Sequence, residues 1–152
     1  MNSNKQVATP ARILLVEDNE DHAYLLIRAL RKVGNENMDV QHIDNGIDAI
    51  EHLNQAQKHN QLPDLVLLDL QIPGLNGHAV LKKIKQDTGT SMTPVIILTT
   101  SDAAQDRQEA YAAHANGYVV KPTGPKSYNK LAHSVHDFWL EWNSSVSIQT
   151  HL

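Results

Sequence analysis

The sequence predicts a doubly wound α/β fold, in which a five-stranded parallel sheet carries five helices on its two faces. Three observations predict it. Four short runs are apolar throughout and rich in Leu or β-branched residues, as in strands buried on both faces of a parallel sheet. The segments between the strands repeat apolar residues every three or four positions, which is typical of helices. The length of 152 residues matches one domain.

The first half of the chain alternates these two patterns. Residues 13–16 form an apolar run and predict the first strand. Residues 23–33 have helical spacing and stop at a glycine, a common helix terminator. Residues 40–43 alternate apolar and polar side chains, which favours an edge or near-edge strand, and residues 47–53 predict the next helix. The run at residues 65–68 predicts a fully buried strand.

The second half continues the alternation. Residues 80–84 have helical spacing after an Asn-Gly pair, and residues 95–98 form the third buried run. The Ala-rich stretch 103–115 predicts a helix, residues 118–120 a last strand, and residues 127–142 a last helix. We therefore expect five strands and five helices in alternation.

Composition excludes several classes of protein. The chain has no cysteine, so a disulfide scaffold, a thiolate metal site and a cysteine nucleophile are excluded. Its 13 Lys and Arg against 17 Asp and Glu give a net charge of −4, which argues against nucleic-acid binding. No apolar run reaches the roughly 18 residues of a membrane span, and no signal peptide is evident. We expect a soluble, cytoplasmic protein with one domain at 10–142 and polar tails at 1–9 and 143–152.

Polar residues follow the predicted strands where ligands bind in open α/β sheets. Glu17 and Asp18 follow the first strand, and Asp69, Thr99 and Lys121 follow later ones. Three carboxylates at one edge repel each other unless a cation is present, and oxygen ligands without His or Cys suit Mg²⁺. Together with a lysine and a hydroxyl, this set suits phosphoryl transfer to an aspartate side chain.

These residues resemble the two-component response-regulator receiver family over residues 10–142. The match to the family lies in an acidic pair after the first strand and in two spacings. These are 30 residues from Asp69 to Thr99 and 22 from Thr99 to Lys121. Tyr118 lies three residues before Lys121, where the family has its switch aromatic. The resemblance implies the flavodoxin-like strand order 2-1-3-4-5. It also implies a protein that promotes its own phosphorylation and dephosphorylation but is not an enzyme.

The resemblance further implies a role for each acidic residue and its neighbour. Asp69 would accept the phosphoryl group from a sensor histidine kinase. Asp18 would bind Mg²⁺ directly, Glu17 would help through water, and the backbone carbonyl of Gln71 would be the third protein ligand.

The remaining roles concern binding and switching. Thr99 would hydrogen-bond one phosphoryl oxygen and Lys121 would pair with another. Tyr118 would move inward as Thr99 approaches the phosphate, and a cis peptide bond would join Lys121 to Pro122.

A narrower resemblance concerns receivers paired with bacterial phytochrome histidine kinases. It is carried by residues 98–102, 110–111, 115–118 and 138–139. A bacteriophytochrome is therefore the expected partner kinase. The alternatives are a generic stand-alone receiver and a phosphorelay shuttle, because the chain length leaves no room for an output domain.

Other functions that fit this fold are less consistent with the residues. A phosphohydrolase that uses an aspartyl phosphate needs a second Asp two residues after the nucleophile, where this chain has Gln71. A flavin carrier needs a Ser/Thr-rich phosphate loop where Glu17 and Asp18 stand. A phosphorylation-independent adaptor would not need the complete site.

The last predicted helix carries an unusual concentration of aromatic residues. Tyr128, Leu131, Val135, Phe138 and Trp142 step by three and four, which predicts one apolar seam against the sheet. Trp139 and Leu140 would then lie beside the seam and be exposed, as in a contact surface. We therefore expect a homodimer through this helix and the C-terminal tail, with these residues except Val135 as interface candidates.

The nine histidines are interpreted as solvated surface residues. His133 and His136 share a helix face, but no carboxylate partner is expected to complete a transition-metal site there.

Overall fold

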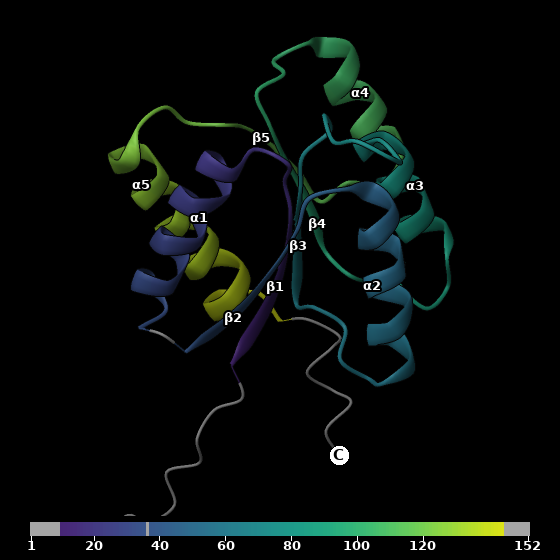
Figure 1. The fold of residues 1–152 in the computed structure, drawn as a ribbon, viewed down its shortest axis with the longest axis horizontal. Coiled ribbons are helices and arrows are strands. Elements are labelled where there is room, and N and C mark those ends of the chain that lie inside the picture. Colours follow the sequence, from purple (N-terminus) through teal and green to yellow (C-terminus); the bar gives the residue numbers. More distant parts are fainter. Residues whose placement is uncertain (1–9, 36, 145–152) are drawn as a thin grey trace, which may run out of the picture.

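The computed structural model describes residues 10–35 and 37–144 and confirms the doubly wound fold (Figure 1). Its parallel sheet has the order β2-β1-β3-β4-β5. The strands are β1 (Ala11–Val16), β2 (Met38–Ile43), β3 (Leu65–Leu68), β4 (Val95–Thr99) and β5 (Gly117–Val120). The helices are α1 (Glu20–Val33), α2 (Gly46–Lys58), α3 (Gly77–Gln86), α4 (Ala104–Ala112), α5 (Pro125–Val135) and the π-helix η1 (His136–Trp142). The predicted tails at 1–9 and 143–152 lie outside the described residues, except for positions 143 and 144.

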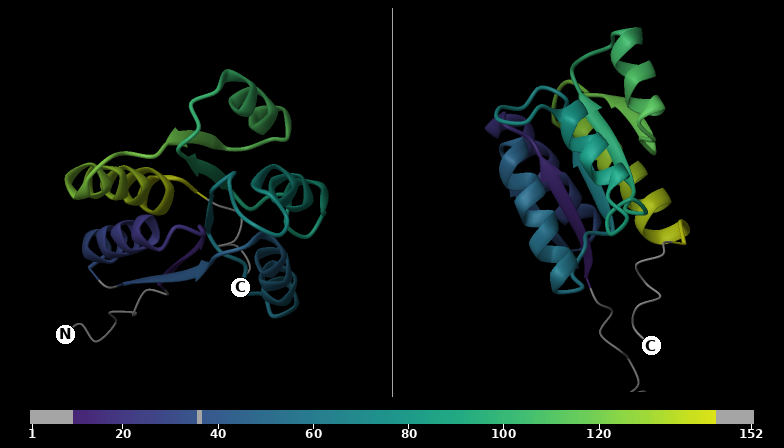
Figure 2. Two further views of the ribbon diagram at one scale, coloured as in Figure 1. Left: turned by 45° about the horizontal axis from the view of Figure 1, so that its top comes forward. Right: turned by 90° about the vertical axis from the view of Figure 1, so that its right-hand side faces the viewer.

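The helices form two layers around the sheet (Figures 1 and 2). Helices α1 and α5 pack against each other on one face, and α2, α3 and α4 lie on the other. None of the helices in the described ranges combines the length and hydropathy of a membrane-spanning segment. The carboxyl ends of all five strands meet at one edge of the sheet, because the strands are parallel.

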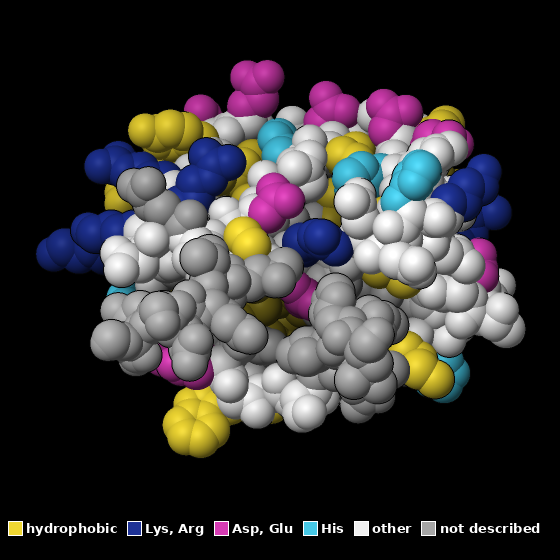
Figure 3. Space-filling model, turned by 90° about the horizontal axis from the view of Figure 1, so that it is seen from below, with side chains coloured by type: hydrophobic (Ala, Val, Ile, Leu, Met, Phe, Trp, Pro, Cys, Tyr) yellow, Lys and Arg dark blue, Asp and Glu magenta, His cyan; other side chains and the backbone are white. Residues whose placement is uncertain are grey.

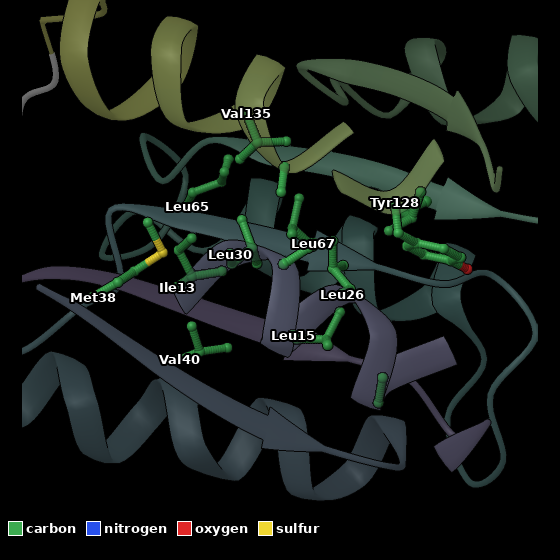
Figure 4. Packing of buried hydrophobic residues seen from close by; sticks show 14 of the residues in the cluster. Ile13, Leu15, Leu26, Leu30, Met38, Val40, Leu65, Leu67, Tyr128 and Val135 are labelled. Atoms are coloured by element: carbon green, nitrogen blue, oxygen red, sulfur yellow. The ribbon is translucent and has the colours of Figure 1, made fainter. Parts of the chain in front are cut away.

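The central strands are buried on both faces, as their apolar runs predict. In β1, Ile13 and Leu15 join the core beneath α1 and α5, whereas Leu14 and Val16 join the core on the opposite face. Strands β3 and β4 divide their side chains in the same way. Figure 4 shows the first of these cores, with Tyr128 and Val135 of α5 closing it. A strand with two packed faces needs apolar residues at every position.

Strand β5 is the exception to this rule. It is the edge strand of the sheet, its residues are half-buried, and Val120 is 41% exposed. The prediction of a strand buried on both faces is therefore wrong for β5. An apolar run does not reveal whether helices cover both sides of a strand.

Three helices begin at asparagine caps, which set where each loop from the sheet ends. The side chains of Asn19, Asn45 and Asn76 each accept a hydrogen bond from the backbone N–H three residues later. These bonds satisfy backbone donors that a helix start leaves free. The first loop places the start of α1 directly beside the carboxyl end of β1.

The last helix changes its geometry at His136, and this changes which residues face the core. From His136 the chain is π-helical, and the N–H of Asn143 donates to the carbonyl of Phe138 at 2.7 Å, five residues back. A π-turn contains more residues than an α-turn, so the spacing of three and four no longer follows one face. Trp139 and Leu140 pack partly buried against the core, whereas Phe138 and Trp142 are 56% and 79% exposed.

The predicted seam is therefore wrong beyond Val135, and four of the six interface candidates, Tyr128, Leu131, Trp139 and Leu140, pack in or against the core. Tyr128 is 2% exposed and packs beneath α5, and Leu131 is half-buried against the same cluster. Phe138 and Trp142 remain as the exposed aromatic pair of this helix. The Phe138 ring also meets the Trp139 ring edge-on, with centroids 5.1 Å apart.

The end of the molecule opposite the carboxyl ends of the strands has a mixed charge (Figure 3). Lys and Arg side chains gather at the left of this view, on the side where α1 lies in Figure 1, and Asp and Glu side chains lie along its upper rim. The described surface on this face therefore carries charges of both signs.

Candidate functional site

A buried ion cluster lies at the carboxyl edge of the sheet. The Lys121 Nζ is 2.7 Å from Oδ2 of Asp69 and 2.5 Å from Oε1 of Glu17. The side chains of all three residues are at most 5% exposed. The structure thus brings together three of the predicted site residues, from the ends of β1, β3 and β5. One buried cation holds two buried carboxylates that would otherwise repel each other.

Backbone contacts position Glu17 within this cluster. Its N–H donates to the carbonyl of Ile43 at 2.9 Å, and its Oε2 accepts from the N–H of Asn19 at 3.0 Å. Burial raises the pKa of the Glu17 carboxyl, against the hydrogen bond from Lys121, which lowers it. Burial alone would lower the pKa of Lys121, but its hydrogen bonds to Asp69 and Glu17 raise it overall. The lysine therefore stays charged.

The acidic residues of this site fit a hard divalent cation. Glu17, Asp18 and Asp69 each offer a carboxylate oxygen, and these oxygens lie within 4.8 Å of one another. Asp18 is exposed, so a solvated ion can reach the cluster. A ligand set made only of oxygen suits Mg²⁺ or a similar ion. Gln71 is exposed, its N–H donates to Oδ1 of Asp69 at 3.1 Å, and the metal role of its carbonyl stays a prediction.

The backbone of Asp69 is held by β1 and by the start of α3. Its N–H donates to the carbonyl of Val16 at 3.0 Å. Gly77, the first residue of α3, donates to the carbonyl of Leu70 at 3.0 Å. A Cβ at Gly77 would lie 2.3 Å from the Asp69 carbonyl oxygen. The helix can approach the Asp69 turn this closely because Gly77 has no side chain.

The predicted switch residues, Thr99 and Tyr118, share one neighbour, Ser101. Thr99 ends β4 and is fully buried, and its Oγ1 accepts from the Ser101 N–H at 3.4 Å. The Tyr118 hydroxyl donates to the Ser101 carbonyl at 2.9 Å, and the Arg107 guanidinium lies 5.7 Å from the centre of the Tyr118 ring. Thr99 and Tyr118 are therefore in contact with the same short loop after β4.

The peptide bond between Lys121 and Pro122 is trans, so the prediction of a cis bond is wrong. A proline permits either isomer, and the residue type alone does not choose between them. The Lys121 N–H donates to the Thr99 carbonyl at 2.7 Å, and this backbone bond holds the lysine beside β4.

Several histidines that sequence reasoning placed in solvent have structural partners. His22 is half-buried, and its Nδ1 is 3.0 Å from the Lys121 Nζ. Burial, and then the positive charge of Lys121, lower the pKa of His22. The lysine ammonium can donate to Nδ1 of the neutral ring. One feature of the sequence could have predicted that His22 lies near the cluster: it stands in the first turn of the helix that follows Glu17 and Asp18.

Two other histidines lie beside carboxylates. His78 is half-buried between Asp106 and Glu109. His136 lies 3.1 Å from Asp137 and forms a cluster with Glu141 that does not include His133, and the expectation that no transition-metal site forms there stays a prediction. The partners of His78 are 28 and 31 positions away in the sequence, beyond the reach of local patterns.

The comparison with known families identifies the class of protein that this fold and site define. The family model of the response regulator receiver domain matches residues 13–133. The chain therefore belongs to the response regulator receiver family, whose members act in two-component signalling.

Two relatives are particularly similar in sequence. The chain is 36% identical to the probable methanogenesis regulatory protein FilR2 of Methanothrix harundinacea, over 90% of this chain and 88% of that protein. It is 34% identical to the response regulator Rcp1 of Synechocystis, over 87% of this chain and 90% of Rcp1. The structure of the Mn²⁺-bound form of Rcp1 has a TM-score of 0.77, with 32% identity over 90% of this chain and 99% of that one.

The phosphorylated cyanobacterial phytochrome response regulator RcpA is also similar in structure. Its TM-score is 0.84, with 30% identity over 90% of this chain and 99% of RcpA. The relatives include one protein crystallised with a divalent metal ion and one crystallised in its phosphorylated form.

Proposed function

We propose that this protein accepts a phosphoryl group on Asp69 from a sensor histidine kinase and signals through a change in its surface or in its oligomeric state. The observation that supports this role is the buried contact between Lys121 and Asp69, next to the acidic pair Glu17 and Asp18. The Asp69 carboxylate is held in place, and Lys121 compensates its charge. Because Asp18 is exposed, the cluster is open to solvent on that side. The kinase draws on ATP, so we place the exchange in the cytoplasm.

The proposed reaction is a displacement at phosphorus. An oxygen of the Asp69 carboxylate forms a bond to phosphorus while the bond to the donor breaks, and the donor leaves with that electron pair. The Lys121 ammonium neutralises charge on one equatorial oxygen of the transferred group, and the Thr99 hydroxyl donates to another. A bound Mg²⁺, held by Glu17, Asp18 and Asp69, supplies further positive charge.

We propose a phytochrome-type photoreceptor kinase as the partner. Support comes from the similarity to RcpA, described as a cyanobacterial phytochrome response regulator, at 30% identity and a TM-score of 0.84. Phosphotransfer from a purified phytochrome kinase that is faster than transfer from an unrelated histidine kinase would support this pairing. Equal rates from both kinases would favour a generic receiver or a phosphorelay shuttle.

Acetyl phosphate is expected to modify the wild-type protein in the presence of Mg²⁺, with a gain of one phosphoryl group in intact mass. Asp69→Asn should gain none, because an amide is not a nucleophile for this transfer. Asp64→Asn is the matched control, since Asp64 also flanks β3 but at its other end, and it should be modified like the wild type. Equal modification of Asp69→Asn and the wild type would contradict the proposed function.

Mg²⁺ is expected to stabilise the wild-type protein against urea by roughly 1–3 kcal/mol at saturating concentration, because it binds the folded acidic cluster. Asp18→Asn should lose most of this gain, since it removes the exposed ligand of the cluster. Asp21→Asn removes an exposed acid from the first turn of α1 and should keep the gain. A gain that is the same in all three proteins would place the ion elsewhere.

We also propose that the protein forms a homodimer through η1. Phe138 and Trp142 expose aromatic surface on one short segment, and exposed aromatic residues are enriched in protein contacts. The C-terminal tail that was predicted to contribute lies outside the described residues. The pair Phe138 and Trp142 therefore replaces the broader set of interface candidates.

Light scattering at tens of micromolar protein is expected to show a dimer in the wild type, in the phosphorylated state, in the unphosphorylated state or in both. The double variant Phe138→Ser, Trp142→Ser should be monomeric and still folded, because both side chains are exposed. Tyr24→Ser removes an aromatic ring that is 61% exposed on α1 and should remain dimeric. A monomeric wild type in both states would exclude this dimer.

A further inference from the structure

The ammonium of Lys121 has a third partner besides the two carboxylates. Its Nζ lies 3.0 Å from Nδ1 of His22, in addition to its contacts with Glu17 and Asp69. A lysine ammonium has three N–H donors, and these three acceptors account for all of them. The Lys121 side chain is only 4% exposed, so water does not readily replace a lost acceptor. His22 is the neutral acceptor of this set, with its own ring proton on Nε2.

The start of α1 holds His22 within reach of the lysine. The His22 N–H donates to Oδ1 of the helix cap Asn19 at 3.0 Å. The N–H of Asn19 in turn donates to Oε2 of Glu17 at 3.0 Å. The buried ring of Tyr128 lies beside the imidazole, with centroids 6.5 Å apart. Together with the ion pair between Lys121 and Glu17, these contacts close into one ring of polar groups beside the carboxyl end of β1.

Lys121 and a divalent cation would draw on the same carboxylates. Glu17 and Asp69 contact the lysine, and both belong to the group of acidic residues that could hold a metal ion. Each contact of the lysine weakens when these oxygens also face a divalent cation, because the two cations share lone pairs and repel each other. His22 is outside that group, and Mg²⁺ prefers oxygen ligands. Nδ1 of His22 therefore keeps its lone pair for the lysine.

We infer that His22 is a positioning residue that keeps the Lys121 ammonium at the site while Mg²⁺ occupies the acidic cluster. The hydrogen bond to His22 takes over part of what the lysine loses at the carboxylates. Lys121 then stays beside Asp69, where the proposed phosphoryl group forms, and His22 itself acts only through the lysine. This inference rests on the proposed function, because it concerns the same site.

The test measures Mg²⁺ affinity by calorimetric titration, with no phosphoryl donor present. His22→Leu removes the acceptor, whereas His22→Asn keeps an amide oxygen at the same number of bonds from the backbone as Nδ1. His52→Leu is the matched control, because it makes the same change at another half-buried helical histidine, on α2 across the sheet. Repeating the titration with His22→Leu in a Lys121→Ala background shows whether the effect passes through the lysine.

His22→Leu is expected to bind Mg²⁺ about three- to tenfold more weakly than the wild type, as the loss of one hydrogen bond in the metal-bound protein implies. His22→Asn and His52→Leu should match the wild type. In the Lys121→Ala background, His22→Leu should change the affinity no further. The inference would be overturned if His22→Leu matched His52→Leu, or if it weakened binding equally with and without Lys121.

Nitrogen-15 NMR of the wild-type histidines provides the test if His22→Leu does not fold. Nδ1 of His22 is expected to stay unprotonated and hydrogen-bonded when Mg²⁺ is added, and to lose the hydrogen-bond shift in Lys121→Ala. Loss of that shift on addition of Mg²⁺ to the wild type would show that His22 releases the lysine, contrary to the inference.

Modification by acetyl phosphate separates the two proposals. Coupling of His22 to Mg²⁺ through Lys121, in a protein that acetyl phosphate does not modify, would support the positioning role and contradict phosphorylation at Asp69. Modification of Asp69 without this coupling would do the reverse. A wild type that binds no Mg²⁺ would also overturn the role of His22.

Discussion

Lys121→Ala is expected to destabilise the metal-free protein by about 3 kcal/mol at neutral pH, in the range found when a buried ion pair loses one partner. The change leaves the carboxylates of Glu17 and Asp69 buried, close together and without their shared cation. Mg²⁺ should then stabilise the variant more than it stabilises the wild type, because the ion replaces the missing positive charge. Urea unfolding with and without Mg²⁺ measures both effects.

The matched control is Lys126→Ala, which removes an exposed lysine from α5 and should change the free energy of unfolding by less than about 0.5 kcal/mol. The proposed role of Lys121 would be contradicted if Lys121→Ala lost no more unfolding free energy than this control and if Mg²⁺ stabilised it no more than the wild type. Lys121 would then not neutralise the cluster.

Gly77→Ala is expected to cost about 2–3 kcal/mol, as for other insertions into packed regions. The new Cβ would lie 2.3 Å from the Asp69 carbonyl oxygen and 2.4 Å from the Leu70 Cα. These are backbone atoms, so either α3 or the turn after β3 must move. Because that turn carries the proposed phosphoacceptor, the rate of modification by acetyl phosphate should fall by at least about tenfold.

Gly117→Ala separates this steric effect from the general effect of replacing a glycine. Its Cβ would meet side-chain atoms of Ile96 at 3.6 and 3.7 Å, which is ordinary contact. We expect a change within about 0.5 kcal/mol and an unchanged rate of modification. Similar losses in the two variants would mean that the approach of α3 to Asp69 does not require a glycine.

The sheet and the acidic cluster were predictable because both follow from local patterns and one topological rule. Each buried strand is a continuous apolar run, and parallel strands end at the same edge. Glu17, Asp69 and Lys121 meet there although 104 positions separate the first from the last. Their contact follows from where each stands relative to its strand.

The features that were missed depend on information that local patterns lack. The contact of His22 with Lys121 and that of His78 with Asp106 join residues 99 and 28 positions apart, and neither histidine ends a strand. The exposed face of the last helix was assigned wrongly because the prediction assumed one helical period throughout. The half-buried state of β5 follows from its edge position, which the apolar run of Tyr118 to Val120 does not reveal.

The geometry of η1 also determines what the protein's intrinsic fluorescence can report. Both tryptophans of the chain lie in this segment, with Trp139 packed against the core and Trp142 79% exposed. Figure 1 shows this part of the chain running away from the edge where Asp69 lies. Emission from the two indoles is therefore an optical probe of the C-terminal helix and of association. If modification of Asp69 changes the tryptophan emission, a structural change must have reached η1 through α5, or the protein must have gained or lost a binding partner.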